Sequence, residues 1–526
     1  MQQAPTLPSG PESGAAKRPA RWLRRPWLWL VGTLLVVPVV LVLVFQLVSA
    51  FQLSRALDDL TRRGEPVTYR EVHALLLAKA PDDDDNLAKV PALLAFQRSD
   101  EGRAALRQLE LEQPAQHELL HRADLDLRQT VRQMAIDARR SAQDFPADLF
   151  PVIYELSAGL HPAVHELAAA TRHRPGAFWS WVEVEDPLST FQRDMAFHGL
   201  DLDRVLDAIG NLQAITIGAI RADDPELATA GIELQLGLLR ASFEGNALLG
   251  GWKVMGMRGS VTGCVHDGLN RRVWDEEQLR RLQSAIELSL PALDSQPFLH
   301  MERIHGLHVN RIYKRHRARL VDHHHRVPPH PAVSKLVRLL PGGAFDQAAL
   351  RAIRVYERDT LQPGALFPPG EPSRREPQAW LEWIEDTTLT DSLTEIENLL
   401  TTDPREIELF AIDMRLDETR LRLAHAMVAL ERFHLKHGRY PTDWPELIPA
   451  LLAEAPLDPF TGGELRLLPV DQGAGRTRPA IYSLGLNRTD NGGVRSPYDG
   501  GFFGRPPTDG DLVWDFPELE AQAAPD

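Results

Sequence analysis

The chain has 526 residues, enough for two or three domains of ordinary size. Hydrophobic residues make up 43% and charged residues 25%, as in folded globular proteins. The formal net charge of −15 argues against nucleic acid as a partner, because nucleic-acid binding needs a basic surface that replaces counterions. A single cysteine, Cys264, excludes an intrachain disulfide framework, and we expect it to be a small buried hydrophobic residue.

The N-terminal region has the composition of a membrane anchor. Residues 1–25 are predicted to be a disordered basic tail, which ends in a cluster of lysine and arginine. Residues 26–54 carry no charge and are predicted to form a transmembrane helix. The most apolar part, Trp27 to Val48, is about 33 Å long as a helix, enough to cross a hydrocarbon core of about 30 Å. The lipid bilayer is therefore the first expected partner.

The basic tail also predicts the orientation of this helix. Positive residues that precede a single span place the N-terminus in the cytoplasm. The chain is then a single-pass protein of the inner (cytoplasmic) membrane with a periplasmic or extracytoplasmic body. A second interpretation is a signal peptide cleaved after Ala50, since Val48, Ser49 and Ala50 resemble a small-residue cleavage site. The apolar run is longer than a usual signal core of about 7–15 residues, which favours an uncleaved anchor.

The expected fold class is mainly α, with a helical extracytoplasmic body at residues 55–400. Apolar residues recur at helical intervals from 199 to 300, and Asp223, Asp224 and Pro225 mark the end of one helix and the start of the next. A third helix is expected after Gly250 and Gly251, and a fourth at about 275–289. This pattern predicts a multi-helix antiparallel body with short turns.

Two segments of the body carry unusual side chains. Residues 301–330 are rich in histidine, arginine and lysine, but their spacing matches no defined zinc motif. A solvated basic surface, facing anionic headgroups or an acidic partner, is the interpretation that we favour over a metal site; the sequence leaves its role open. Trp179 and Trp181 are expected to fill a core, and a carbohydrate or peptide site would require these rings to be exposed.

The C-terminal region changes character. A long helix is predicted from residue 404 to His437, where Gly438 ends it. Three short strands are predicted at 464–468, 480–484 and 511–515. Residues 403–517 are therefore expected to form a small α+β module with a short antiparallel sheet, followed by a disordered tail at 518–526.

Five short motifs follow one another along this module. They are Gly438-Arg439-Tyr440-Pro441, Asp458-Pro459-Phe460, Tyr482-Ser483-Leu484-Gly485, Asp490-Asn491-Gly492-Gly493 and Asp509-Gly510-Asp511-Leu512. With these motifs in this order, the module resembles the C-terminal domain of the major pseudopilins of type II secretion. The chain is more similar still to uncharacterised membrane-anchored proteins of planctomycetes and related bacteria. Its first helix lacks the glutamate that pseudopilins carry near the start of theirs, so the resemblance implies the fold of the module and not assembly into a pilus.

The resemblance also implies a calcium ion in the loop after the second strand. The matching positions are the backbone carbonyl of Leu484 and the side chains of Asn487, Asp490, Asn491, Asp509 and Asp511. These residues supply hard oxygen ligands of the kind that Ca²⁺ prefers. Aspartate, asparagine and glycine are also the ordinary residues of turns, so a metal-free loop is the competing interpretation.

No catalytic set stands out in the sequence. Cys264, His266 and Asp267 place a thiol, an imidazole and a carboxylate close together, but groups adjacent in sequence seldom form a triad. The leading hypothesis is a membrane-anchored protein of structural or interaction type, with protein partners in the cell envelope and a link to secretion or envelope assembly. The alternative is an envelope hydrolase or ligand-binding protein whose site is built from dispersed residues.

Overall fold

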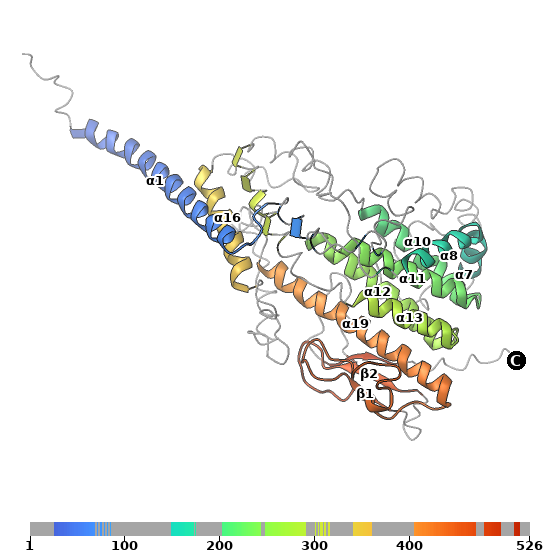
Figure 1. The fold of residues 1–526 in the computed structure, drawn as a ribbon. Helices are drawn as coiled ribbons and strands as arrows, with labels where there is room; N and C mark the ends of the chain where they lie inside the picture. The colour runs from blue at the N-terminus through green and yellow to red at the C-terminus, as the bar shows by residue number, and fades with distance from the viewer. Residues whose placement is uncertain are drawn as a thin grey trace, which may run out of the picture.

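The fold was analysed in a computed structural model of the full chain. It describes residues 26–68, 149–172, 202–243, 248–290, 340–359, 404–469, 478–495 and 510–515, with scattered residues at 71–85, 174 and 300–315. The described part is mostly helical, with one small three-stranded antiparallel sheet and one N-terminal apolar helix (Figure 1). The expected fold class is confirmed at this level.

Helix α1 (Pro26–Arg62) projects from the rest of the protein (Figure 1). Its 37 residues span about 55 Å, considerably more than a hydrocarbon core needs. From Leu34 to Val48 nearly every large apolar side chain is exposed, with Leu34 at 69% and Leu47 at 72%. By length and composition it is the one helix of the described residues that could cross a membrane. The helix continues eight residues past the predicted end at 54, because residues 53–60 gain a packing partner in α16 (Gly342–Asp359).

The helical body is built as the periodicity predicts. Helices α10 (Leu202–Arg221), α11 (Pro225–Phe243), α12 (Leu248–Arg271) and α13 (Glu276–Ser289) pack on one another through a continuous apolar core. Two earlier helices, α7 (Leu149–Leu156) and α8 (His161–Thr171), cover α10 and α11, with the short 3₁₀ turn η4 (Ala158–Leu160) between them. The third helix begins before Gly250 and Gly251 and not after them, so the glycine pair lies inside α12.

The turns between these helices follow from their polar residues. Asp223 adopts a φ of 57° and ends α10, while the Asp224 carboxylate accepts a hydrogen bond from the Leu227 backbone N–H at 3.1 Å and so caps α11. Asp275 and Gln278 form a reciprocal capping box at the start of α13. The predicted helix end and start at Asp223, Asp224 and Pro225 are therefore confirmed, and α13 begins close to the predicted residue 275.

The C-terminal helix α19 (Pro404–His437) matches its predicted bounds and leads through a 3₁₀ turn, η6 (Trp444–Glu446), to the sheet. Strands β1 (Arg466–Leu468), β2 (Ala480–Ser483) and β3 (Leu512–Trp514) pair in that order, all antiparallel. Each strand is shorter than predicted by one or two residues. The buried central strand β2 lies against α19.

Helix α19 lies between the sheet and helices α12 and α13 (Figure 1). One apolar cluster runs from Phe150 in α7 to Trp514 in β3 without interruption. A fully buried ion pair, Arg258 Nη1 to Asp417 Oδ2 at 3.0 Å, joins α12 to α19 inside this core. The helical body and the C-terminal module therefore share a single core.

Several predicted features lie outside the described residues. These are the tails at 1–25 and 518–526, most of the helical sequence expected between 87 and 148, the tryptophans at 179 and 181, the basic segment beyond 315 and the boundary near 400–403.

His425, on α19, gives this core a dependence on pH. Burial and the nearby cations of Arg422 and Arg432 lower its pKa to about 4, and its Nε2 atom has no hydrogen-bond partner among the described residues. Because the unfolded chain binds the proton more readily, the stability is complete above pH 6.5 and falls as the pH drops from about 6.5 to 4, by about 3 kcal/mol. Chemical denaturation across this range should show that slope, and His425→Gln should remove it. The matched change of an exposed histidine, His437→Gln, should leave the slope as it is.

Candidate functional site

The place where α1 leaves the body is the most distinctive site of the described residues. We call it the junction: residues 45–60 of α1, helix α16 and the helical residues of segment 303–315. The Gln347 side-chain N–H donates to Ser49 Oγ at 3.0 Å and to Gln52 Oε1 at 2.9 Å, and Ser49 is fully buried. Gly343 lies so close to α1 that a Cβ there would stand 3.0 Å from the Gln46 Cα.

The junction has its own small apolar core. Leu60 of α1, Leu307, and Ala349 and Ile353 of α16 form a cluster separate from the main core. Arg303 is fully buried beside it, where its guanidinium pairs with Glu65 and donates to the Pro66 carbonyl at 2.8 Å. These contacts hold the loop after α1 against segment 303–315. Breaking the pair would leave the Arg303 charge buried without a partner, which is costly.

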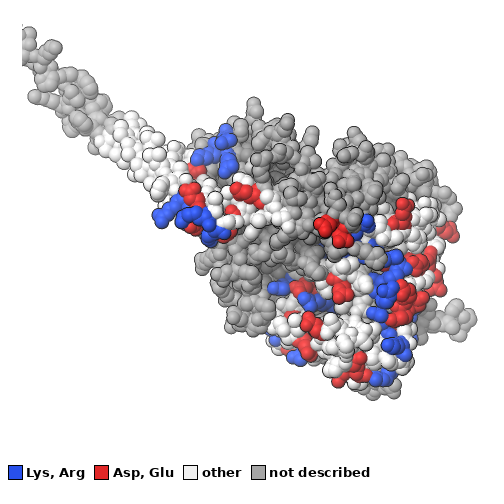
Figure 2. Space-filling model, viewed as in Figure 1, with Lys and Arg blue, Asp and Glu red and all other residues white. Residues whose placement is uncertain are grey.

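The basic segment predicted at 301–330 enters the structure here. Arg303, Leu307 and Asn310 lie on its buried side, whereas Arg311, Lys314 and Arg315 are exposed on the other. Lys314 Nζ pairs with both oxygens of Asp346 at 2.7 Å. Figure 2 shows basic and acidic side chains gathered where the uncharged surface of α1 meets the body.

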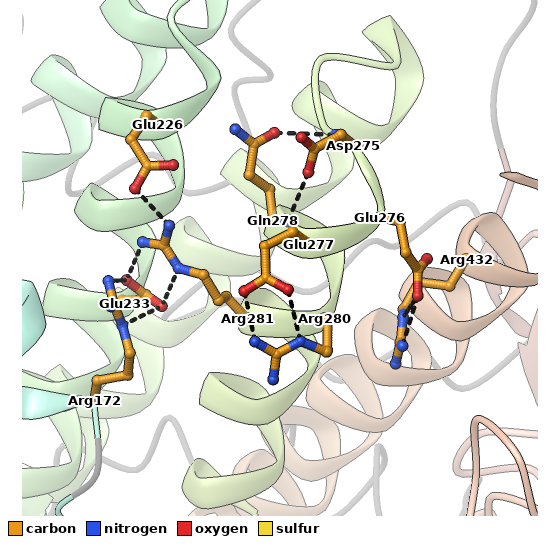
Figure 3. Close-up of polar contacts among 10 residues, drawn as sticks. All are labelled: Arg172, Glu226, Glu233, Asp275, Glu276, Glu277, Gln278, Arg280, Arg281 and Arg432. Atoms are coloured by element: carbon orange, nitrogen blue, oxygen red, sulfur yellow. Dashed lines mark hydrogen bonds and ion pairs between the residues drawn. The ribbon is translucent and has the colours of Figure 1, made fainter.

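A second polar cluster links three helices of the body (Figure 3). Glu233 of α11 accepts hydrogen bonds from Arg172 at 3.1 and 3.0 Å and from Arg281 of α13 at 3.1 and 2.8 Å. Glu226 takes the remaining end of the Arg281 guanidinium. Both oxygens of Glu233 are thus engaged by guanidinium groups, which suits a structural clamp and leaves no oxygen free to act as a base.

Cys264, His266 and Asp267 do not converge. His266 Nε2 lies 2.8 Å from the Asp515 carbonyl and stacks near Trp514, while Asp267 accepts from Arg221 at 3.2 Å and from Arg271 at 3.4 Å. Burial raises the pKa of the Cys264 thiol and lowers that of His266. A buried thiol held protonated is a poor nucleophile, so the three residues serve packing and helix contacts.

The predicted calcium loop is described except for Asp509, which lies outside the described residues. Asp511 accepts hydrogen bonds from the backbone N–H groups of Asn491 at 3.3 Å and Gly493 at 2.8 Å. Asp490 accepts from the Gly492 N–H at 2.9 Å and from the Tyr482 hydroxyl at 3.0 Å, which lowers the pKa of its carboxyl. Asn487 bonds to Asn491 at 3.3 Å. Of the predicted residues, the structure links Asn487 to Asn491 and Asn491 to Asp511, with Asp490 between them in sequence.

The oxygens of this loop are largely engaged by the chain's own donors. Among the described residues, no group of three or more histidine, cysteine or acidic side chains is placed to hold a metal ion. A calcium ion needs six to eight oxygens, so it would have to displace some of these hydrogen bonds or draw on residues beyond them. The calcium site therefore stays a prediction.

The sequence analysis missed the residue that orders this region, which is Asp458. Its buried carboxylate accepts from the Phe460 N–H at 2.9 Å, the Ser483 hydroxyl at 2.8 Å and the Leu484 N–H at 3.0 Å. It thereby ties the turn before β1 to the end of β2. The signal was present in the Asp458-Pro459-Phe460 motif, but a turn aspartate in sequence does not reveal what it holds across the fold.

A comparison with models of protein families, with curated proteins and with solved structures found no match to this chain. The resemblance to pseudopilins is therefore carried by the motifs alone.

The Glu233 clamp should be a large contributor to stability. Glu233→Ala leaves two guanidinium groups next to each other at a position where Glu233 itself is 3% exposed, so we expect a loss of about 3 kcal/mol in the free energy of unfolding. Glu277→Ala removes an exposed pair with Arg280 on the same helix and should change stability little. Chemical denaturation of both variants checks this; equal, small effects would contradict the clamp.

The calcium prediction has a direct test. If the ion binds, millimolar calcium raises the melting temperature and slows protease cleavage between 485 and 510 relative to the same protein in chelator, because the ion binds only the folded loop. Asp490→Asn removes one charged ligand without touching the buried core and should abolish both effects. A melting temperature and cleavage pattern indifferent to calcium would rule the site out.

Proposed function

We propose that this protein is an uncleaved single-pass membrane protein whose body and C-terminal module lie on the extracytoplasmic side and act through contacts with other proteins of the envelope. The observation that carries the first part is the exposure of α1. An apolar stretch exposed on all sides from Leu34 to Val48 is unstable in water, and together with the apolar residues that precede it from Trp27 it is long enough to cross a bilayer.

The junction supports an anchor that stays attached. Ser49 and Ala50 lie in the middle of α1, and Ser49 is buried against Gln347. Cleavage after Ala50 would divide the helix at the point where it begins to pack on α16, and would separate Gln347 from one of its two partners. Ser49, the middle residue of the possible cleavage site, thus has a packing role in the intact chain.

The polar clusters support a role in interaction. In the described residues, the buried titratable groups around Glu233, Asp267 and Asp417 hold helices together through ion pairs. The motifs shared with pseudopilins favour a link to secretion or envelope assembly. Chemical crosslinking in native membranes, followed by identification of the captured proteins, tests this link: components of a secretion or pilus-like system support it, and a consistent small-molecule adduct would favour the hydrolase or binding protein instead.

The anchor can be tested with matched substitutions. The full-length chain should stay in the membrane pellet after carbonate extraction, with Met1 or Gln2 as its first residue. Leu41→Arg with Leu47→Arg should release it, because arginine within a span costs about 3 kcal/mol per residue. Leu435→Arg with Leu457→Arg makes the same change at exposed leucines outside the span and should leave it in the pellet.

Two outcomes would contradict this proposal. A wild-type chain of full length that washes free in carbonate is not an integral membrane protein. A mature chain that begins at Phe51 has lost its anchor by cleavage.

A further inference from the structure

The junction defines a direction for the basic segment. Along α1 and α16 the contacts advance together, from Gly343 beside Phe45 and Gln46 to Ile353 beside Leu60, so the two helices run parallel. Segment 303–315 runs the opposite way, because Gly306 lies against Ala352 whereas Lys314 pairs with Asp346. The segment therefore advances towards the apolar part of α1 as its residue number rises.

The depth of its end can be estimated from the helix geometry. A hydrocarbon core of about 30 Å that starts at Trp27 ends about 20 residues later, near Gln46. Gln46 is also where α1 ceases to be fully exposed, and Ser49 is the first buried residue after it. Lys314 pairs with Asp346, the neighbour of Gln347, which bonds to Ser49. Arg315 thus lies roughly 5 Å beyond the core, which is the depth of lipid headgroups.

The side chains at this depth form a one-sided cationic stripe. Arg311 and Arg315 are one helical turn apart and exposed on the same side as Lys314. Among the described residues, neither arginine has an ion pair with a carboxylate, and Asp346 pairs with Lys314. One turn of helix is about 5 Å, so Arg311 also lies within a Debye length of about 8 Å of the headgroups.

We propose that Arg311, Lys314 and Arg315 form a binding surface for anionic lipid headgroups of the leaflet next to the body. The buried side of the segment, held by Arg303 and Leu307, presents the stripe at a fixed height. This fixes the body against the membrane surface at a second point besides α1. The proposal rests on the proposed membrane anchor, since the depth of the stripe is counted from α1.

The experiment measures lipid preference of the full-length chain reconstituted in vesicles. Spin-labelled phosphatidylglycerol and phosphatidylcholine report the relative association constant of the anionic over the zwitterionic lipid. Arg311→Glu with Arg315→Glu should lower this ratio well over fivefold, since one basic residue at an anionic surface is alone worth about fivefold, and the difference from wild type should vanish at high salt. The N-terminal basic tail is present in both chains, so it does not contribute to the difference.

Three further variants secure the result. Arg311→Lys with Arg315→Lys keeps the charge and should keep the wild-type ratio. Arg272→Glu with Arg280→Glu reverses two exposed arginines at α13, far from α1, and should also keep it (Figure 1). If the glutamate variant fails to fold, Arg311→Gln with Arg315→Gln replaces it. This variant is expected to lower the lipid ratio by a smaller factor.

Depth is measured independently. A nitroxide at Arg315→Cys should be broadened by a lipid whose headgroup carries a nickel chelate, whereas one at Arg280→Cys should not; Cys264 is buried and does not react. An unchanged lipid ratio in the glutamate or glutamine variants of a chain that stays in the carbonate pellet overturns this proposal alone and leaves an acidic protein as the partner of the stripe. Release of the wild-type chain by carbonate overturns the anchor as well.

Discussion

Everything at the junction depends on one constraint: an apolar helix whose described side chains are exposed from Thr33 to Phe45 and which packs on α16 along the stretch that follows. Exposure of the first half to water is unfavourable because its side chains are apolar. The second half is held by its contacts with α16 and by the pair between Arg303 and Glu65. The two requirements meet within one helical turn, between Gln46 and Ser49. Helix α1 is continuous through this point, so its exposed apolar stretch and the part that packs on α16 share one axis.

The sequence predicted the fold well where one physical signal was strong. Periodic apolar residues and the Asp223–Pro225 turn were enough to locate α10, α11 and α13, and Gly438 marked the end of α19. The start of α12 was wrong because a glycine pair in sequence indicates a break, whereas tertiary packing can hold glycine within a helix. What the sequence could not show is that the last residues of α1, beyond the predicted span, pack on a segment almost 300 positions away.

The functional residues were harder to predict for the same reason. Arg303 belongs to a histidine- and arginine-rich segment, which by composition indicates a solvated surface, yet it is fully buried. Its partners at 65 and 66 lie more than 230 residues earlier in the chain, and no local pattern connects them. Asp458 was recognised as a turn residue, but its hold on Ser483 and Leu484 is a property of the folded sheet. The division of the segment into a buried side and a charged side does follow the helical period, and that much could be read from residues 303, 307, 310 and 311.

The position of α19 has a consequence for mechanics. The helix is 34 residues long, about 50 Å, and it contributes one side to the sheet and another to α12 and α13. Arg478, just before β2, pairs with Glu431 of α19 and donates to the last carbonyls of α12, at Leu269 and Asn270. A mechanical load applied to the sheet is thus carried by helix α19 and its contacts, and not by a flexible segment. A protein that docks there cannot pull the small sheet away by itself; it must displace α19, α12 and α13 together with it.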